Sequence, residues 1–359
     1  MIVSNSLIAP PRLKLLVHES RTLDRVLPRL EAFALGTGQL PLTRHPGWLK
    51  VLQGGLRHAP FCIEAVEESQ TRGFLPLAYV RSMLFGKFLV SLPYLNYGGV
   101  MADDEETANA LINRAADLAD KLNVRYLELR HEGGVDHPAL VHRVSSKVHM
   151  RLELPVSADI LWKKLDAKVR NQVRKGQKAG LTVVFGGLEI LPEFYAVFSH
   201  NMRDLGTPVY SPKLFTGALQ QFPGRAEFCV VRAGATPVAA SLILHGWGIS
   251  EVPSASSLRQ HNHTNANMLM YWHLLERAIS RGQNQFDFGR SSPDSTTYRF
   301  KKQWGAQAAP ADWQYYLRAG AVGDMRPDNP RYERLIRLWQ RLPVRLTRWI
   351  GPTIVRGIP

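Results

Sequence analysis

The order of helices and strands predicted after Pro155 constrains the fold of this chain more than any other feature of its sequence. Helical periodicity dominates early, three neighbouring strand-like runs follow, and one more helix then leads into a short strand. This order predicts a mixed, mostly antiparallel sheet flanked by helices, which is an α/β (α+β) fold. The predicted elements are helices over 158–178, 191–205, 212–221 and 265–281, and strands over 181–185, 227–232, 237–245, 249–254 and 285–288.

The residues before Pro155 follow a looser version of the same order. A helix is predicted over 102–122, with Asp103 and Asp104 in its first turn, where carboxylates suit the helix dipole. Its apolar residues recur at helical spacing. Strands are predicted around it at 74–80, 87–92, 124–129 and 148–154.

The length of 359 residues favours two domains over one. We therefore predict a first domain over 1–155, a second over 156–322 whose last strand packs on the first, and a tail over 323–359. The two cysteines, Cys62 and Cys229, lie in apolar runs and predict buried reduced thiols, which fits the cytoplasm. Neither a signal peptide nor a membrane-spanning helix is expected, because no basic region precedes the first apolar residues and no run reaches ~18 apolar residues.

The net charge of +15 is concentrated in two stretches. Residues 163–178 carry seven Lys or Arg against Asp166, and residues 331–359 carry seven Arg against Glu333, a net of +6 in each. Such patches predict an anionic partner, which could be nucleic acid, a phosphorylated carrier or a membrane surface. In the first stretch, the basic side chains lie off an apolar stripe and predict either contact with substrate phosphates or a solvated helix face. The candidate residues there are Lys168, Arg170, Arg174 and Lys175.

Two loop segments carry polar and aromatic side chains beside glycines. Residues 92–100 (LPYLNYGGV) place Tyr97 next to a Gly-Gly pair, which allows a tight turn and close backbone approach. Residues 201–211 (NMRDLGTPVYS) place Arg203 and Tyr210 on either side of a Gly and a Pro that end a helix. The first segment is interpreted either as a turn that packs the core or as a substrate-cleft wall. The second is interpreted either as a plain helix stop or as a connector whose polar side chains contact substrate.

The segment from Phe286 to Gln307 gathers more ionisable side chains than a structural turn requires. Lys301 is the predicted cation for negative charge on an acyl carbonyl oxygen, although its neighbour Lys302 could take that role. Asp287 or Asp294 could orient or deprotonate an attacking amine, or Asp287 could be a paired structural acid. The remaining candidates for substrate contact in this segment are Arg290, Ser291, Asp294 and Tyr298.

These motifs resemble those of the FemABX aminoacyltransferase family, which is related to the GNAT N-acyltransferases. The similarity covers roughly residues 75–320 and is closest to members linked with PEP-CTERM/exosortase and exopolysaccharide loci. It rests on the basic helix KVRNQVRKGQKAG, the connector NMRDLGTPVYS, GATPVAASLILHG, the helix start NANMLMYW at Asn265 and, most specifically, FDFGRSSPDSTTYRFKKQWGA.

The resemblance implies two tandem GNAT-like domains, the second of them catalytic. It implies transfer of an aminoacyl group from tRNA to an amine on a lipid- or UDP-linked cell-envelope or exopolysaccharide precursor. It also implies a functional Phe-Lys pair, matched here by Phe300 and Lys301, anionic substrate on the basic helix, and substrate contact at Asn265. No metal or redox cofactor is implied, because the donor, aminoacyl-tRNA or acyl-CoA, is a substrate.

Two other functions stay open. The segment around Tyr298 and Lys301 also resembles acyl-CoA-using GNAT relatives of polysaccharide biosynthesis. The pyrophosphate loop of such enzymes, which sits at a helix N-terminus, has only a poor match at 177–182, and this favours the aminoacyl donor. A non-catalytic RNA- or glycan-binding protein on a GNAT scaffold would suit the net charge equally well.

The stretch 331–359 predicts a basic amphipathic helix. Four leucines share one helical face with a parallel row of arginines, and Trp339 and Trp349 could act as interfacial anchors. This composition is typical of a helix that lies on an anionic membrane, and the alternative is a helix packed on the protein's own surface. Pro343 should kink or break the helix. Membrane contact would place a cytoplasmic protein peripherally on the inner face of the plasma membrane.

Overall fold

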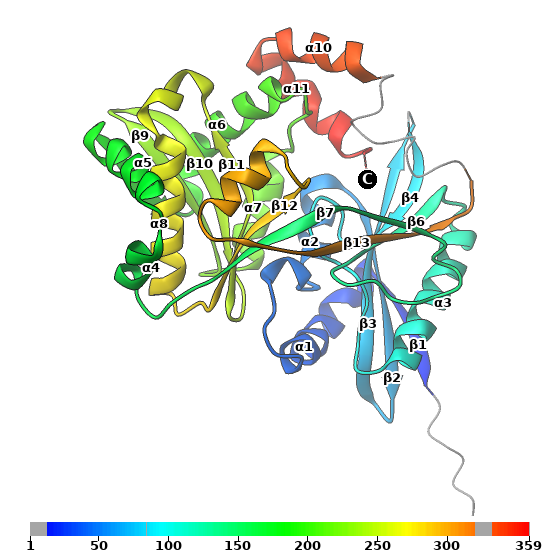
Figure 1. The fold of residues 1–359 in the computed structure, drawn as a ribbon. Coiled ribbons are helices and arrows are strands. Elements are labelled where there is room, and N and C mark those ends of the chain that lie inside the picture. The colour runs from blue at the N-terminus through cyan, green and yellow to red at the C-terminus, as the bar shows by residue number, and fades with distance from the viewer. Residues whose placement is uncertain (1–12, 84, 320–331, 359) are drawn as a thin grey trace, which may run out of the picture.

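The structure is a computed structural model, and it describes residues 13–83, 85–319 and 332–358. The amino-terminal residues and the start of the predicted tail at 323–331 lie outside the described residues. Within the described ranges, all thirteen strands belong to one sheet (Figure 1). They are β1 (Lys14–Glu19), β2 (Ala59–Glu67), β3 (Gln70–Ser82), β4 (Gly86–Val90), β5 (Met101–Ala102), β6 (Tyr126–His131), β7 (His142–Glu153), β8 (Leu181–Gly186), β9 (Ala226–Ala233), β10 (Thr236–His245), β11 (Ile249–Ser257), β12 (Gln285–Ser291) and β13 (Gln307–Leu317).

Helices flank this sheet on both sides. They are α1 (Ser20–Gly36), α2 (Trp48–Leu56), α3 (Glu105–Lys121), α4 (Ala158–Lys164), α5 (Ala167–Lys178), α6 (Leu191–Asp204), α7 (Pro212–Gln221), α8 (Ala266–Ser280), α9 (Thr296–Lys302), α10 (Glu333–Arg341) and α11 (Val344–Val355). Short 3₁₀ helices are η1 (Leu42–Arg44), η2 (Leu188–Ile190) and η3 (Arg259–Thr264).

The strand order is β1-β2-β3-β4-β6-β13-β7-β12-β11-β10-β9-β8, and β5 pairs with β3 at the side. Only β4 with β6 and β11 with β12 run parallel among the described pairs, so the predicted mixed, mostly antiparallel α/β fold is confirmed. The late strand β13 lies between β6 and β7 and crosses the middle of the molecule (Figure 1). The two halves therefore share one sheet, and the proposed domain bounds stay predictions.

Apolar side chains on the two sides of the sheet form separate cores. One core runs through both halves, where α1 and α2 of the first half meet α6 and α7 of the second. Another lies under α4, α5 and α8, and a third packs α3 on β2, β3 and β6. Both cysteines are buried and free, as predicted. No helix of the described residues is long and apolar enough to cross a membrane.

The predicted helix over 158–178 is wrong as a single helix. It breaks at Leu165 and Asp166, whose backbones are extended, with ψ near 145° at both. The break lets α4 pack Leu161 and α5 pack Val169 and Val173 in the same core as α8. Tertiary packing has here overridden a continuous helical pattern. The carboxy-terminal helix also breaks, at Leu342 and Pro343, and the expected effect of Pro343 is confirmed.

Candidate active site

The strands β11 and β12 separate in the middle of the sheet. They pair in parallel only where Ile249–Glu251 meets Gln285–Asp287, although both strands continue beyond these residues. Gly289 follows on β12 with φ of +78°, a conformation that favours glycine. A side chain there would point toward Asn96 Nδ2 at 3.2 Å, the Val252 carbonyl oxygen at 3.7 Å and Lys301 Nζ at 3.9 Å.

Lys301 reaches this separation from α9. Its ammonium donates to the carbonyl oxygens of Gly289 at 3.0 Å and Arg290 at 2.9 Å, and its side chain is buried. Burial lowers the pKa of Lys301 to about 8; Asp287 opposes this effect and Arg290 adds to it. The neighbouring Lys302 is exposed and lies over the Tyr298 ring, so Lys301 is the lysine that faces the site.

Asp287 of β12 is fully buried and accepts three hydrogen bonds. Its Oδ1 accepts from the Gly289 amide at 2.6 Å, and its Oδ2 accepts from the Tyr97 hydroxyl and from Arg151 Nε at 3.2 Å. Arg151 Nη2 also donates to the Tyr97 oxygen at 2.7 Å, and Arg151 Nη1 donates to Glu132. Because its oxygens are engaged by these donors, Asp287 acts as a paired acid that positions Tyr97 and Arg151.

Tyr97 owes its position to the Gly-Gly pair in residues 92–100. The amides of Gly98 and Gly99 both donate to the Arg130 carbonyl oxygen, at 3.2 and 3.1 Å. A Cβ at Gly99 would collide with the His131 ring, so this close approach requires glycine. Burial raises the pKa of Tyr97, and the Asp287 carboxylate raises it further, so the hydroxyl stays protonated as a donor.

Glu251 of β11 adds a second buried acid beside Asp287. Its Oε1 accepts from the Thr43 amide at 2.6 Å, and its Oε2 lies 2.7 Å from the Thr43 hydroxyl oxygen. Burial raises the pKa of Glu251 to about 8, and the Asp287 carboxylate contributes in the same direction. Glu251 is therefore mostly neutral at pH 7 and ties η1 of the first half to the second-half sheet.

Arg44, the last residue of η1, places a partly buried cation near Arg151. Among the described residues, no hydrogen bond or ion pair joins it to another side chain. Burial lowers its pKa, and Glu132 and Tyr97 act in the opposite sense while Arg151 adds to the lowering. An unpaired, partly buried guanidinium next to Arg151 can bind an anionic group.

Further polar atoms near β7 and β12 lack partners. His149 is fully buried and stacks on Tyr97 with ring centroids 4.2 Å apart, yet neither ring nitrogen has a hydrogen bond among the described residues. Burial lowers its pKa to about 3, with Arg151 adding to the effect. Ser291 Oγ and Arg290 Nε are likewise unsatisfied. Such groups are costly unless water or a ligand pairs with them.

The structure thus brings five of the sequence-predicted residues to one place, at the separation of β11 and β12. They are Tyr97, Asp287, Arg290, Ser291 and Lys301. Arg44, Glu132, His149, Arg151 and Glu251 join them and were not predicted.

A sequence signal existed for two of the residues that were not predicted. His149 and Arg151 alternate with the apolar Met150 and Leu152 along a predicted strand. No such signal marked Arg44 or Glu251.

The other predicted residues lie elsewhere. Phe300 packs on Tyr271 in the core, with centroids 5.0 Å apart, and Asp294 is exposed in a turn at φ of +60°. Tyr298 lies on α9 beside Lys302. Arg203 donates to the Leu342 carbonyl and thus holds the carboxy-terminal helices.

Asn265 is in the left-handed region at φ of +56°, where its carbonyl approaches Gly176. Tyr210 packs against Tyr94, with ring centroids 5.4 Å apart, and both line a small apolar cavity of about 30 Å³ beside β11.

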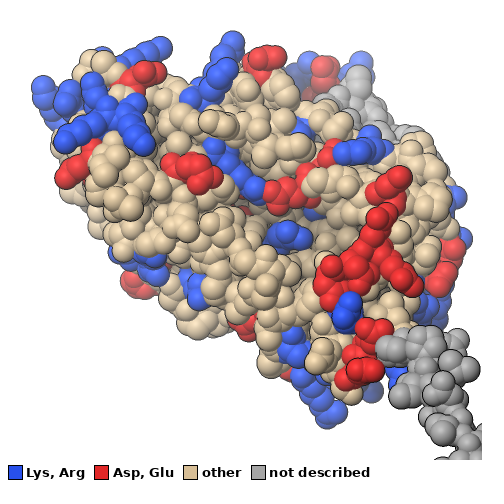
Figure 2. Space-filling view, turned by 60° about the horizontal axis from the view of Figure 1, so that its bottom comes forward, with Lys and Arg blue, Asp and Glu red and all other residues tan. Residues whose placement is uncertain are grey.

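The basic residues of α5 form an exposed surface. Lys168, Arg174 and Lys175 are exposed, and Arg170 is half-buried with its guanidinium near the carbonyl oxygens that end α4. Figure 2 shows a dense group of Lys and Arg at the left of the view, over the α4–α5 side of the molecule. This surface carries no residue of the cluster around Lys301.

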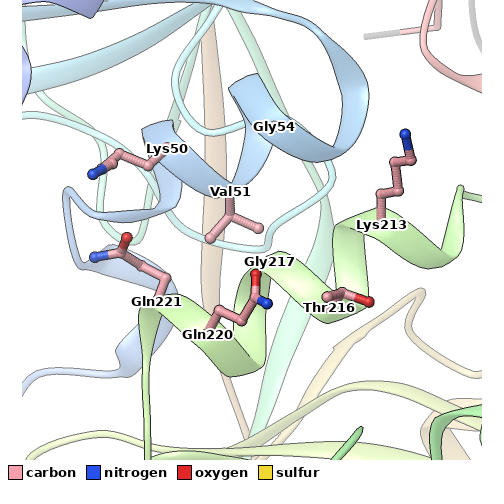
Figure 3. A pocket seen from close by; sticks show the side chains of 8 residues that line it. All are labelled: Lys50, Val51, Gly54, Lys213, Thr216, Gly217, Gln220 and Gln221. Carbon is pink, nitrogen blue, oxygen red and sulfur yellow. The ribbon is translucent and has the colours of Figure 1, made fainter.

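A larger cavity, of about 410 Å³, lies between α2 and α7 (Figure 3). It shares no lining residue with the cluster around Lys301, and none of the predicted site residues lines it. Its lining residues are Lys50, Val51, Gly54, Lys213, Thr216, Gly217, Gln220 and Gln221. Among the described residues, no group of His, Cys, Asp and Glu could hold a metal ion.

Comparison with known proteins agrees with this fold. Residues 163–302 match the family described as an acetyltransferase (GNAT) domain. No curated protein sequence matches the chain.

The structure of FemX is similar with a TM-score of 0.60 at 14% identity, over 81% of this chain and 96% of that one. A tandem GNAT protein from the clavulanic acid biosynthesis pathway is similar with a TM-score of 0.53 at 15% identity, over 86% of this chain and 100% of that one. The C-terminal domain of a putative lysylphosphatidylglycerol synthetase from Agrobacterium fabrum is similar with a TM-score of 0.54 at 10% identity, over 82% of this chain and 92% of that one.

These likenesses show a GNAT-like fold, and a tandem GNAT protein is among the structures that share it. The matched region of residues 163–302 contains β11, β12 and Lys301, so it includes the second-half residues of the cluster. The residues that the first half and β7 contribute, such as Tyr97 and Arg151, lie outside it. Together, the matched family and the fold support an acyltransferase.

Proposed function

We propose that the protein is an N-acyltransferase that forms an amide on a cell-envelope or exopolysaccharide precursor, with its reacting groups meeting beside Lys301. The observation that carries this proposal is the buried Lys301 ammonium, which donates two of its three N–H groups to carbonyl oxygens of β12. The third N–H is left for the oxygen of an incoming acyl group. Donors held in advance at a developing oxyanion supply a large share of the catalysis of acyl transfer.

The surrounding groups have complementary roles in this proposal. Asp287 holds Tyr97 and Arg151 in place, and the cations Arg151 and Arg44 face the remainder of the substrate. A phosphate or carboxylate on the acceptor or donor would pair with Arg44, whose side chain has no hydrogen bond or ion pair within the part of the chain that the structure describes. The unpaired nitrogens of His149 could accept or donate a hydrogen bond to the same molecule.

For the donor, we favour an aminoacyl group carried by tRNA. The exposed basic face of α5 suits a polyanion, and the residue motifs resemble those of the FemABX family. The similarity to FemX and to a putative lysylphosphatidylglycerol synthetase is in keeping with this choice. The link to PEP-CTERM and exopolysaccharide systems rests on the motifs alone.

Acyl-CoA is the second candidate donor, and the GNAT domain favours it. Beyond Glu251 and Asp287, β11 and β12 no longer pair with each other. Backbone N–H and C=O groups that face this gap could form hydrogen bonds with an extended acyl carrier.

The test is to incubate purified protein with charged tRNA or acyl-CoAs and with lipid-linked or UDP-linked amine acceptors. Mass spectrometry would detect the amide product, and it would also identify any ligand that copurifies. Product formed from one donor and abolished by Lys301→Met would support the proposal. Salt-dependent RNA binding with no transfer from any donor would instead favour a non-catalytic RNA-binding protein.

A further inference from the structure

The two carboxy-terminal helices are fixed to the protein by one side only. Gln340 of α10 donates to the Asp204 carbonyl at 3.2 Å, and Trp339 is buried. Arg348 of α11 donates to Ser199 Oγ at 2.6 Å, and Thr347 is buried on the same side of that helix. Both helices therefore pack on α6, and Figure 1 shows them together at the edge of the molecule above it.

The opposite side of each helix exposes large apolar side chains. Leu335 and Leu338 of α10 are 63% and 60% exposed, and Trp349 of α11 is 78% exposed. Leu346 of α11 is 37% exposed. At 100° per residue, Leu338, Leu346 and Trp349 lie away from the buried side of their helices, so they point away from α6. Leu335 lies one turn before the buried Trp339 and flanks this outward face, where its side chain is nevertheless exposed. Isolated exposed leucines are ordinary, but four exposed large apolar groups on two adjacent helices require an explanation.

Exposed arginines accompany these apolar side chains. Arg334, Arg337, Arg341 and Arg345 are exposed, and Glu333 is the only acid among residues 331–359. Only Arg337 has an ion pair with an acid there, to Glu333 at 3.5 Å, among the described residues. The face is therefore cationic and apolar together.

This combination separates the carboxy-terminal face from the basic face of α5. The exposed side of α5 carries Lys, Arg, Asn and Gln without a large apolar residue, which suits a polyanion in water. The outward side of α10 and α11 adds leucine and tryptophan, which gain free energy only where they leave water. An anionic lipid bilayer offers both a negative surface and an apolar interior.

We propose that the outward face of α10 and α11 docks on an anionic lipid bilayer. Leu335, Leu338, Leu346 and Trp349 would insert at the level of the headgroups, and the neighbouring arginines would contact the lipid phosphates. The proposal does not depend on the identity of the acyl donor or on catalysis. It does bear on the acceptor, because Tyr94, three residues from Tyr97, donates to the Val355 carbonyl at the end of α11.

The experiment is flotation of the purified full-length protein with vesicles of phosphatidylcholine alone or mixed with phosphatidylglycerol. We expect binding to the mixed vesicles only. Leu335→Ser, Leu338→Ser and Trp349→Ser combined should weaken this binding at least about tenfold, since each group buries apolar area on insertion. Each of Arg334→Gln and Arg341→Gln should weaken it about fivefold, from about 1 kcal/mol per basic residue at the surface.

Matched variants control for general loss of charge or apolar surface. Val141→Ser and Leu188→Ser replace exposed apolar residues elsewhere, and Arg21→Gln and Arg25→Gln replace exposed arginines of α1. These should bind vesicles like the wild-type protein. Circular dichroism of each variant would check that the helices remain folded.

A second measurement reports on insertion directly. Lipids brominated in their acyl chains should quench the fluorescence of the bound wild-type protein more than that of the bound Trp349→Phe variant. The proposal is overturned if the protein does not float with anionic vesicles, or if the α10–α11 variants and the controls bind equally. It is also overturned if the Arg334→Gln and Arg341→Gln substitutions weaken binding of the protein to RNA while the wild-type protein binds no vesicle.

Discussion

The Tyr97 hydroxyl donates a hydrogen bond to Asp287 although 190 residues separate them in the chain. Tyr97 comes from the first half and Asp287 from the second, and Arg151 of β7 donates to both. The candidate site is therefore assembled across the sheet that the two halves share. Changes in either half should reach it, and the predictions below test residues from both.

Lys301→Met should reduce the rate of transfer about 10²–10³-fold, because it removes the donor nearest to the developing negative charge. The substrate KM should change little, since the interaction is stronger in the transition state than in the bound substrate. Steady-state kinetics would measure both. Lys302→Met, which changes an exposed neighbour, is the matched control. Equal losses in the two variants would contradict the assignment.

Lys301 should also give the stability of the protein a specific pH dependence. Its pKa is about 8 in the folded protein and 10.5 for an unperturbed lysine. Between these values the unfolded chain binds more protons, so the free energy of unfolding contributed by this group rises with pH. The rise is at most about 3 kcal/mol, from about 1.4 kcal/mol per pH unit. Urea unfolding of the wild-type protein and Lys301→Met at pH 7.5 and 10 would reveal it as a difference.

Glu251→Gln should stabilise the protein at pH 8 and above and have little effect near pH 5. The raised pKa of about 8 means that the folded protein binds the extra proton between the ordinary value of 4.5 and 8, so the free energy of unfolding falls across that window. Glutamine reproduces the neutral acid, since its oxygen can accept from the Thr43 amide and its NH₂ can donate to the Thr43 hydroxyl.

The measurement is the free energy of unfolding of both proteins at several pH values. Glu227→Gln serves as a contrast. Burial raises the pKa of Glu227, but hydrogen bonds from His245 and Arg277 outweigh this effect and lower the pKa to about 2. This second variant should be destabilised throughout the range. A Glu251→Gln protein that is less stable than wild type at pH 8 would show that Glu251 is ionised there.

The sequence predicted local elements better than long-range contacts. Helix α7 and the succession of strands along the chain after Pro155 followed from periodicity and turn residues. The segment 286–307 singled out Lys301, which the structure places at the separation of β11 and β12, and its catalytic role stays a prediction. The break of the helix at Leu165 was missed because it arises from packing against α8, which no local pattern encodes. Tyr97 was identified from its glycines, but its partner Asp287 could not be assigned without the pairing of distant strands.

The residues that sequence reasoning missed share a physical cause. Arg44 and Glu251 stand alone in otherwise ordinary segments, and their properties come from burial by elements far away in the chain. A raised or lowered pKa depends on neighbours in space. Phe300 was predicted as a site residue because the family resemblance implies a Phe-Lys pair. It packs against the core instead of facing the site with Lys301, because successive helical residues point in different directions.

Gly99→Ala should destabilise the protein by about 2 kcal/mol, because the added methyl group collides with the His131 ring. His131 cannot easily move, since it is buried and its Nδ1 lies 2.9 Å from Gln314 Oε1. The displaced loop should also lower activity through Tyr97. Thermal unfolding would measure the first effect. Gly133→Ala is the control, because a Cβ there meets no atom within 4 Å. Equal stability of the two variants would contradict the predicted collision.

Arg44→Met should make the protein more stable and lower its affinity for substrate. Among residues 13–83, 85–319 and 332–358, the partly buried Arg44 guanidinium has no hydrogen-bonded partner. Its replacement by an apolar side chain should therefore raise the free energy of unfolding by about 1 kcal/mol. The KM of an anionic substrate should rise at the same time, because the charge that would pair with it is gone.

Arg151→Met is the contrasting variant. Arg151 donates to Asp287, Tyr97 and Glu132, so its loss leaves a buried carboxylate uncompensated and should cost about 3 kcal/mol of stability. Opposite shifts in unfolding free energy for two neighbouring arginines would distinguish a ligand-binding cation from a structural one. If Arg44→Met instead lowers stability and leaves the KM unchanged, Arg44 supports the fold, and the anionic end of the substrate must be bound elsewhere.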